Sequence, residues 1–138
     1  PSATGASDVF DDRLARHFRQ VRLVPGDHLM TQGEASRGLF LVQDGRVTVE
    51  IDTPAGPVRL RSMGRGALVG EVSLYLDAAC TATVRADSHV EALHLEPEAF
   101  ARLQSEDPVA AAELNRLTTR VLAQRLQAAD HMIQGLVT

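Results

Sequence analysis

One short segment carries the residues best suited to hold a ligand. Gly70 precedes Glu71, Val72 and Ser73, and the run 70–76 predicts a single helical turn. Glycine has no Cβ, so an anion can approach its backbone closely. The free N–H groups at the start of a helical turn attract negative charge. A helical turn inserted among strands is unusual, and we expect the ligand site here.

The residue sets of common catalysts are not recognisable. Cys80 is the only cysteine, which excludes an intrachain disulfide and any CxxC metal or redox motif. It is better interpreted as a small core residue than as a redox sensor. His89 and His94 share one expected strand, but a spacing of five places them on opposite faces. With no nucleophile–base pair, metal set or paired acid, we expect neither an enzyme nor a bound metal or other cofactor.

The composition and charge of the chain exclude further classes of protein. The chain has 138 residues, 44% of them apolar, which suffices for one domain with a real core. All 14 basic residues are arginine, and 18 acidic residues give a net charge of -4. Such a charge argues against a nucleic-acid partner. No apolar run reaches the roughly 18 residues of a membrane span, and no signal peptide is evident, so we expect a cytoplasmic location.

The elements that must position the ligand site are mostly strands. Between residues 19 and 95, short apolar runs alternate with polar residues and end at Gly, Pro or Asp. The pair Asp44-Gly45 predicts a two-residue hairpin. Turns about every 8 to 12 residues indicate an antiparallel barrel or sandwich. The expected strands cover 19–24, 28–31, 39–43, 46–52, 58–63, 67–69, 80–86 and 89–95.

Helical periodicity flanks the strands. A first helix is expected over 9–18, another from Glu96 to near Asp107, and a long one from Pro108 towards Leu136. The last helix would span about 42 Å, too long to lie entirely on a small barrel. The expected fold is mainly β with an N-terminal helix, a short helix at the ligand site and a long C-terminal helix. We expect a tail or linker at 1–8 and a single domain over 9–138.

The long helix carries two apolar stripes offset by one residue. The first stripe is expected to pack on the strands and contains Ala110, Leu114, Leu117 and Val121. The second stripe is a homodimer seam, a lid over the ligand or further core, and contains Leu122, Leu126, Ala129, Ile133 and Leu136.

Taken together, these motifs resemble a cyclic nucleotide-binding domain, the β-roll of bacterial cAMP receptor proteins and protein kinase A regulatory subunits. The resemblance runs from Phe10 to about Ile133 and implies an antiparallel, jelly-roll-like double-stranded β-roll. Within the family the chain is most similar to domains attached to sulfate-permease-type transporters, on residues 70–76 and 122–126. The motifs that carry the resemblance are Val24–Met30, Gln32–Glu34, Leu39–Val42, Asp44–Val49, Gly70–Leu74 and Thr81–Val84.

The resemblance implies a phosphate-binding cassette at residues 70–83. Glu71 then accepts hydrogen bonds from the ribose, which suits an acceptor-only carboxylate, and Thr81 or Thr83 donates to the phosphate or lines the base. Cys80 stands where the family usually has an arginine that pairs with the cyclic phosphate. Losing a charged hydrogen bond costs about 1.5–3 kcal/mol, which weakens binding roughly 10- to 150-fold.

Other arginines near the cassette are candidates for the missing charge. Arg85 is an odd number of residues from Cys80, so on a regular strand it points to the opposite face. Arg65 lies in a turn just before the cassette and is the better candidate. The remaining two are Arg59 and Arg61.

The resemblance therefore implies a regulatory module that senses cAMP or cGMP, weakly because of Cys80. Its long helix relays occupancy to an attached domain such as an anion transporter, and Asp130 lies near the position that caps the base. The expected partner is a cyclic nucleotide or a related small anion. The alternative is a degenerate β-roll that binds no nucleotide and acts as a protein-interaction or dimerisation domain.

Overall fold

A computed structural model describes residues 12–137, with side chains to residue 135. The sequence predictions for the tail at 1–8, the start of the first helix and the Leu136 side chain lie outside this part of the chain. The described elements are α2 (Asp12–Ala15), β1 (Arg19–Leu23), β2 (His28–Met30), β3 (Leu39–Asp44), β4 (Val47–Thr53), β5 (Gly56–Met63), β6 (Leu68–Val69), α3 (Glu71–Leu76), β7 (Thr83–Ala86), β8 (Val90–Leu95), α4 (Pro97–Glu106) and α5 (Pro108–Val137).

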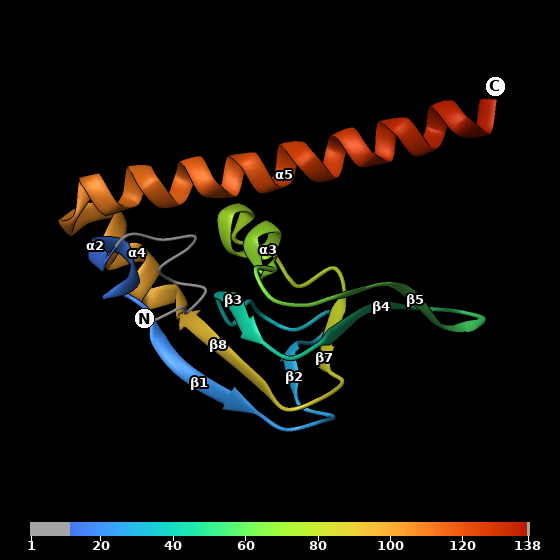
Figure 1. The fold of residues 1–138 in the computed structure, drawn as a ribbon, viewed down its shortest axis with the longest axis horizontal. Coiled ribbons are helices and arrows are strands. Elements are labelled where there is room, and N and C mark those ends of the chain that lie inside the picture. The colour runs from blue at the N-terminus through green and yellow to red at the C-terminus, as the bar shows by residue number, and fades with distance from the viewer. Residues whose placement is uncertain (1–11, 138) are drawn as a thin grey trace.

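The strands form two four-stranded sheets. One has the order β1-β8-β3-β6 and the other the order β2-β7-β4-β5. All pairs between neighbouring strands are antiparallel. Figure 1 shows the helices gathered on one side of the strands, with α3 between α5 and the sheets. The expected mainly-β, antiparallel two-layer fold with flanking helices is confirmed.

The hairpin expected at Asp44-Gly45 is wrong. The strands on either side of it, β3 and β4, belong to different sheets, so the chain crosses between the layers here. Gly45 has a φ of 97°, and a Cβ at this position would collide with the carbonyl oxygen of His89. The glycine thus serves the backbone conformation and close approach of a crossover. The actual hairpin of this region joins β4 to β5 at Thr53 and Gly56.

Strand β3 is buried on both faces and separates two cores. Leu39 and Leu41 face the core shared with the helices, whereas Phe40 and Val42 face the core between the sheets. This alternation follows from the two-residue period of a strand. Because β3 has no solvated face, its sequence is a continuous apolar run.

The helix α5 lies across the first core and continues past it. Asp107 accepts a hydrogen bond from the N–H of Ala110 at 3.3 Å, and Pro108 begins the helix, so an N-cap and a proline fix its start. Of the first apolar stripe, Ala110 and Leu114 are fully buried, as the sequence predicted. In Figure 1 the C-terminal half extends beyond α3, on the same side as the β4–β5 hairpin. Among the described helices none is long and apolar enough to cross a membrane.

Candidate functional site

A pocket opens where α3, the inner face of the second sheet and α5 meet. The space between its walls is about 440 Å³, part of which is open to solvent. The apolar lining consists of Met30, Val49, Met63, Val69, Ala82 and Val84, together with Val72 of α3. The polar lining consists of Arg61, Gly70, Glu71, Ser73, Thr81 and Arg125. An apolar floor with a few convergent polar groups is the usual composition of a ligand site.

Gly70 positions α3 against β3. It precedes the helix with a φ of 92°, a conformation that glycine adopts at little cost. A Cβ on Gly70 would collide with the carbonyl oxygen of Gly38, at the entrance to β3. The sequence analysis explained the glycine by the close approach of an anion. In the structure, the absence of a Cβ allows the backbone of Gly70 to pack on the backbone of Gly38.

Glu71 is the one acidic residue among the described lining residues, and it forms an ion pair with an arginine of α5. Its side chain is 3% exposed and forms an ion pair with Nη1 of Arg125. Nη2 of Arg125 donates to the carbonyl oxygen of Leu68 at 2.6 Å. A carboxylate so deeply buried requires a charged or hydrogen-bonding partner, since an unpaired charge is costly away from water. One arginine therefore joins the long helix both to the start of α3 and to β6.

A bulge in the β4–β5 pair separates Arg61, on the pocket face, from Arg59, on the other face. Arg61 lies opposite Val49, but Arg59 lies opposite Glu50, because the register shifts between these pairs. Residues opposite one another on antiparallel strands share a face, and successive residues alternate faces. Arg61 is thus on the face of Val49, which lines the pocket, and Arg59 is on the other face. Partial burial lowers the pKa of Arg61, the nearby Arg125 lowers it further, and Glu71 opposes them.

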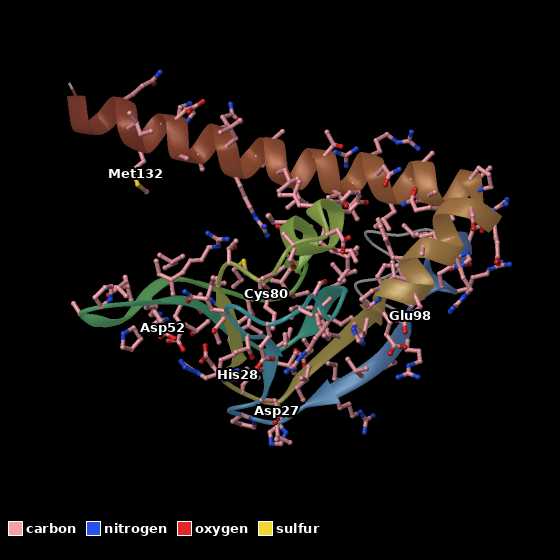
Figure 2. All side chains as sticks on the ribbon, turned by 180° about the vertical axis from the view of Figure 1, so that it is seen from behind. Asp27, His28, Asp52, Cys80, Glu98 and Met132 are labelled. Atoms are coloured by element: carbon pink, nitrogen blue, oxygen red, sulfur yellow. The ribbon has the colours of Figure 1, made fainter. Side chains whose placement is uncertain are left out.

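Of the hydroxyl and thiol groups singled out in the sequence, only Thr81 and Ser73 reach the pocket wall. The Thr83 hydroxyl accepts the backbone N–H of Gln32 at 3.0 Å instead. Cys80 is 3% exposed, and its Sγ lies 3.8 Å from both Ala35 O and Ser73 Oγ. Figure 2 shows it next to α3. Cys80 is thus a core residue behind the pocket wall, in the same apolar cluster as the lining residues Val49, Val69 and Val84.

Three further charged candidates do not line the pocket. Arg65 is exposed in the turn between β5 and β6, a turn that the Gly66 N–H fastens to Val42 O at 2.8 Å. Arg85 pairs with Glu50 at 3.2 Å on the other face of the sheet, as the odd spacing predicted. Asp130 is exposed on α5, five residues beyond Arg125. Five residues of α-helix rotate a side chain by about 140°, so Asp130 points away from the pocket.

A second polar cluster links α3 to α5. Tyr75 of α3 donates to Asn115 Oδ1 at 2.8 Å, and Thr118 donates to the tyrosine oxygen at 3.3 Å. Burial raises the pKa of Tyr75, and the hydrogen bond from Thr118 opposes that shift. The cluster holds the end of α3 on the helix whose Arg125 holds its start.

The two pocket arginines differ in how well the sequence could have identified them. Arg61 was one of four candidates, and only the bulge distinguishes it from Arg59. Arg125 had a readable signal that was missed. It follows Leu114, Thr118 and Val121 at steps of 4, 3 and 4, so it continues the buried face of the long helix. A lone arginine on such a face predicts a buried acidic partner.

Comparison with known proteins gives a consistent result at three levels. The family model described as "Cyclic nucleotide-binding domain" matches residues 20–107. Glutaminase 2 of Bradyrhizobium diazoefficiens is 33% identical over 111 residues, which cover 80% of this chain and 17% of that protein. The cAMP-dependent protein kinase type II regulatory subunit of Drosophila melanogaster is 32% identical over 79 residues, 56% of this chain and 21% of that protein. The chain thus spans about a fifth of these relatives.

Among solved structures, the catabolite activator protein of Thermus thermophilus superposes with a TM-score of 0.74 and 28% identity. The match covers 91% of this chain and 57% of that one. The two antiparallel sheets, the short α3 beside the pocket and the long C-terminal helix agree with this likeness. With the family model matching well over half of its residues, the chain belongs to the cyclic nucleotide-binding domain family.

Proposed function

We propose that the chain is a regulatory module that binds a cyclic nucleotide, cAMP or cGMP, in the pocket beside α3. The observation that carries the proposal is the composition of that pocket: an apolar floor, one buried carboxylate and two arginines. The apolar floor suits a base, Glu71 suits the ribose hydroxyl, and the arginines suit the phosphate. Cys80 supplies no charge, so we expect weak binding.

Occupancy reaches the rest of the protein through α5. Glu71 is the proposed ribose acceptor and also the ion-pair partner of Arg125. A ribose that donates a hydrogen bond to Glu71 shares this carboxylate with Arg125, whose Nη1 contacts Oε1, and it therefore changes how firmly α5 is held. A ligand shifts such an equilibrium only by its differential affinity for the two states. The relay predicts that cyclic nucleotide changes hydrogen exchange over residues 109–136, and exchange that stays the same with ligand contradicts it.

In this proposal, an attached domain receives the signal from α5. Of the two relatives named above, one is a glutaminase and the other is a regulatory subunit of a protein kinase. A catalytic or regulatory effector therefore fits as the attached domain. An anion transporter of the sulfate-permease type and a cytoplasmic location stay predictions from the sequence.

Calorimetric titration with cAMP and with cGMP tests the binding. We expect weak binding by the wild-type chain and tighter binding by Cys80→Arg, by roughly 10- to 150-fold. The longer side chain reaches the pocket wall along Ser73, whose Oγ lies 3.8 Å from the thiol. Cys80→Met is the matched control, because it adds length without charge. No binding by the wild-type chain contradicts the proposed function.

A second candidate function is an interaction domain that has lost its ligand. The observation that favours it is the exposed apolar side of α5, where Leu126 is 65%, Met132 70% and Ile133 58% exposed. Figure 2 shows Met132 directed towards the side of the β4–β5 hairpin, with no element packed on it in this view. If only Cys80→Arg binds nucleotide, this second function is favoured.

A further inference from the structure

The two arginines of the pocket are not matched by acidic groups. Arg61 and Arg125 both line it, and Glu71 is the single carboxylate among the described lining residues. Arg125 already holds Glu71. Within the described part of the chain, no hydrogen bond or ion pair engages the Arg61 guanidinium, which feels the repulsion of Arg125 and a weaker attraction to Glu71. The pocket mouth thus carries one positive charge in excess.

An anion bound in the pocket would offset this excess of positive charge. Partial burial and a like charge both disfavour the charged form of Arg61. An arginine stays protonated in proteins all the same, so the excess positive charge stays in the pocket. Arg61 also lies on the pocket face in regular register with Val49, while a bulge turns Arg59, two residues before it, to the other face. Bulges commonly redirect a side chain at a functional site.

Resting on the proposed function, we infer that Arg61, on the β5 side of the pocket, binds the phosphodiester of the ligand together with Arg125. The excess of one positive charge matches the single negative charge of a cyclic phosphodiester. Two guanidinium groups can each donate two parallel hydrogen bonds to phosphate oxygens. Arg61 is then the residue that gives the pocket its preference for a phosphorylated nucleoside.

The test is a calorimetric comparison of Arg61→Gln with Arg59→Gln, using cAMP and adenosine as probes. Both arginines are exposed on the same strand, so neither change should alter the unfolding midpoint. We expect Arg61→Gln to weaken cAMP roughly 10- to 150-fold, the effect of one charged hydrogen-bonding group, and to leave adenosine unchanged. Arg59→Gln should bind both as the wild type does. Arg61→Lys should lie between, since it keeps the charge and loses the fork.

The outcomes separate this inference from the proposed function. If wild type binds cAMP and Arg61→Gln binds it as Arg59→Gln does, the inference is wrong and the proposed function stands. If Arg61→Gln weakens adenosine as much as cAMP, Arg61 acts on the nucleoside and the inference is also wrong. If wild type binds no cyclic nucleotide, both fail together. A loss confined to cAMP supports the inference.

Discussion

The two halves of α5 have the same secondary structure but very different surroundings. Over residues 108–121 the helix contributes three fully or nearly fully buried apolar residues to the first core: Ala110, Ala111 and Leu114. Over residues 122–135 every side chain is exposed except Arg125, which is half-buried. Apolar packing holds the first half, whereas in the second half Arg125 contacts Glu71 and the carbonyl oxygen of Leu68.

This contrast shows that the helix is not stabilised evenly along its length. A helix in water is marginal unless one face packs on something, and the residues beyond Arg125 have no such face in the described structure. Local opening is therefore expected to begin at the C-terminal end and to stop where packing begins. The pocket lies next to the boundary between the packed and the exposed half of α5. A bound ligand can therefore shift the residue at which local opening stops.

The largest effect is expected from a cavity in the packed half. Leu114 is fully buried, and Leu114→Ala should lower the free energy of unfolding by about 2–5 kcal/mol. Urea unfolding measures the loss, with Leu126→Ala, on the exposed half of the same helix, as the control. Equal losses for the two variants would show that the halves are not different in kind.

The next effect concerns the ion pair at the boundary. Arg125→Gln removes the charged partner of Glu71, which is almost fully buried, and should cost about 1.5–3 kcal/mol. Hydrogen exchange should also become faster beyond residue 121 while staying unchanged over 108–118. Arg120→Gln is the control, since Arg120 is exposed on the same helix. Unchanged exchange beyond residue 121 in Arg125→Gln would contradict the assigned role of the pair.

A pH-dependent effect is expected at the other end of the packed half. Hydrogen bonds from Arg13 and then His17 hold the pKa of Asp107 well below its ordinary value. A carboxyl with a lowered folded-state pKa stabilises the fold above its unfolded value of about 4. That stabilisation is lost as pH falls towards the folded value.

Asp107→Asn should therefore be less stable than wild type at pH 6, and the gap should narrow by pH 2.5. Urea unfolding at both values measures it, and pH effects from groups that do not contact Asp107 cancel in the difference. Asp12→Asn, at the exposed start of α2, should show little gap at either pH. A gap for Asp107→Asn that does not vary with pH would mean that the carboxylate charge is not what stabilises the junction.

Local pattern predicted the elements well and their partners poorly. The strand at 46–52 was readable because its two faces differ, and β4 covers Val47–Thr53. The crossing at Asp44-Gly45 was not, because a positive φ suits a hairpin and a crossover equally and only the sheet decides between them. The strand expected at 80–86 begins only at Thr83, since the backbone of Cys80 pairs with Gly33 and Glu34 in a loop.

In the candidate site, too, the sequence predicted local features better than contacts between distant residues. Gly70 and Glu71 were found because they are adjacent in sequence and start a helical turn. The second half of the site depends on distant residues: Arg125 lies 54 positions from Glu71. Strict alternation would put Arg59 on the same face as Arg61, and only the bulge, which alternation does not foresee, separates them. Arg65 looked better because it is near the cassette in sequence, yet the turn that carries it is fastened to β3.

The smallest effect on stability is expected from the exposed half. Exchanging Leu126 and Ile133 for Gln should change the free energy of unfolding by no more than about 0.5 kcal/mol per site, the usual range for surface positions. The second candidate function predicts that the wild-type chain self-associates through this face and that the double variant is monomeric. Light scattering over a range of concentrations decides the point. A wild-type monomer at the highest concentration contradicts the dimer, and it leaves the exposed half of α5 as a segment that Arg125 links to the pocket and that is thus available to respond to a ligand.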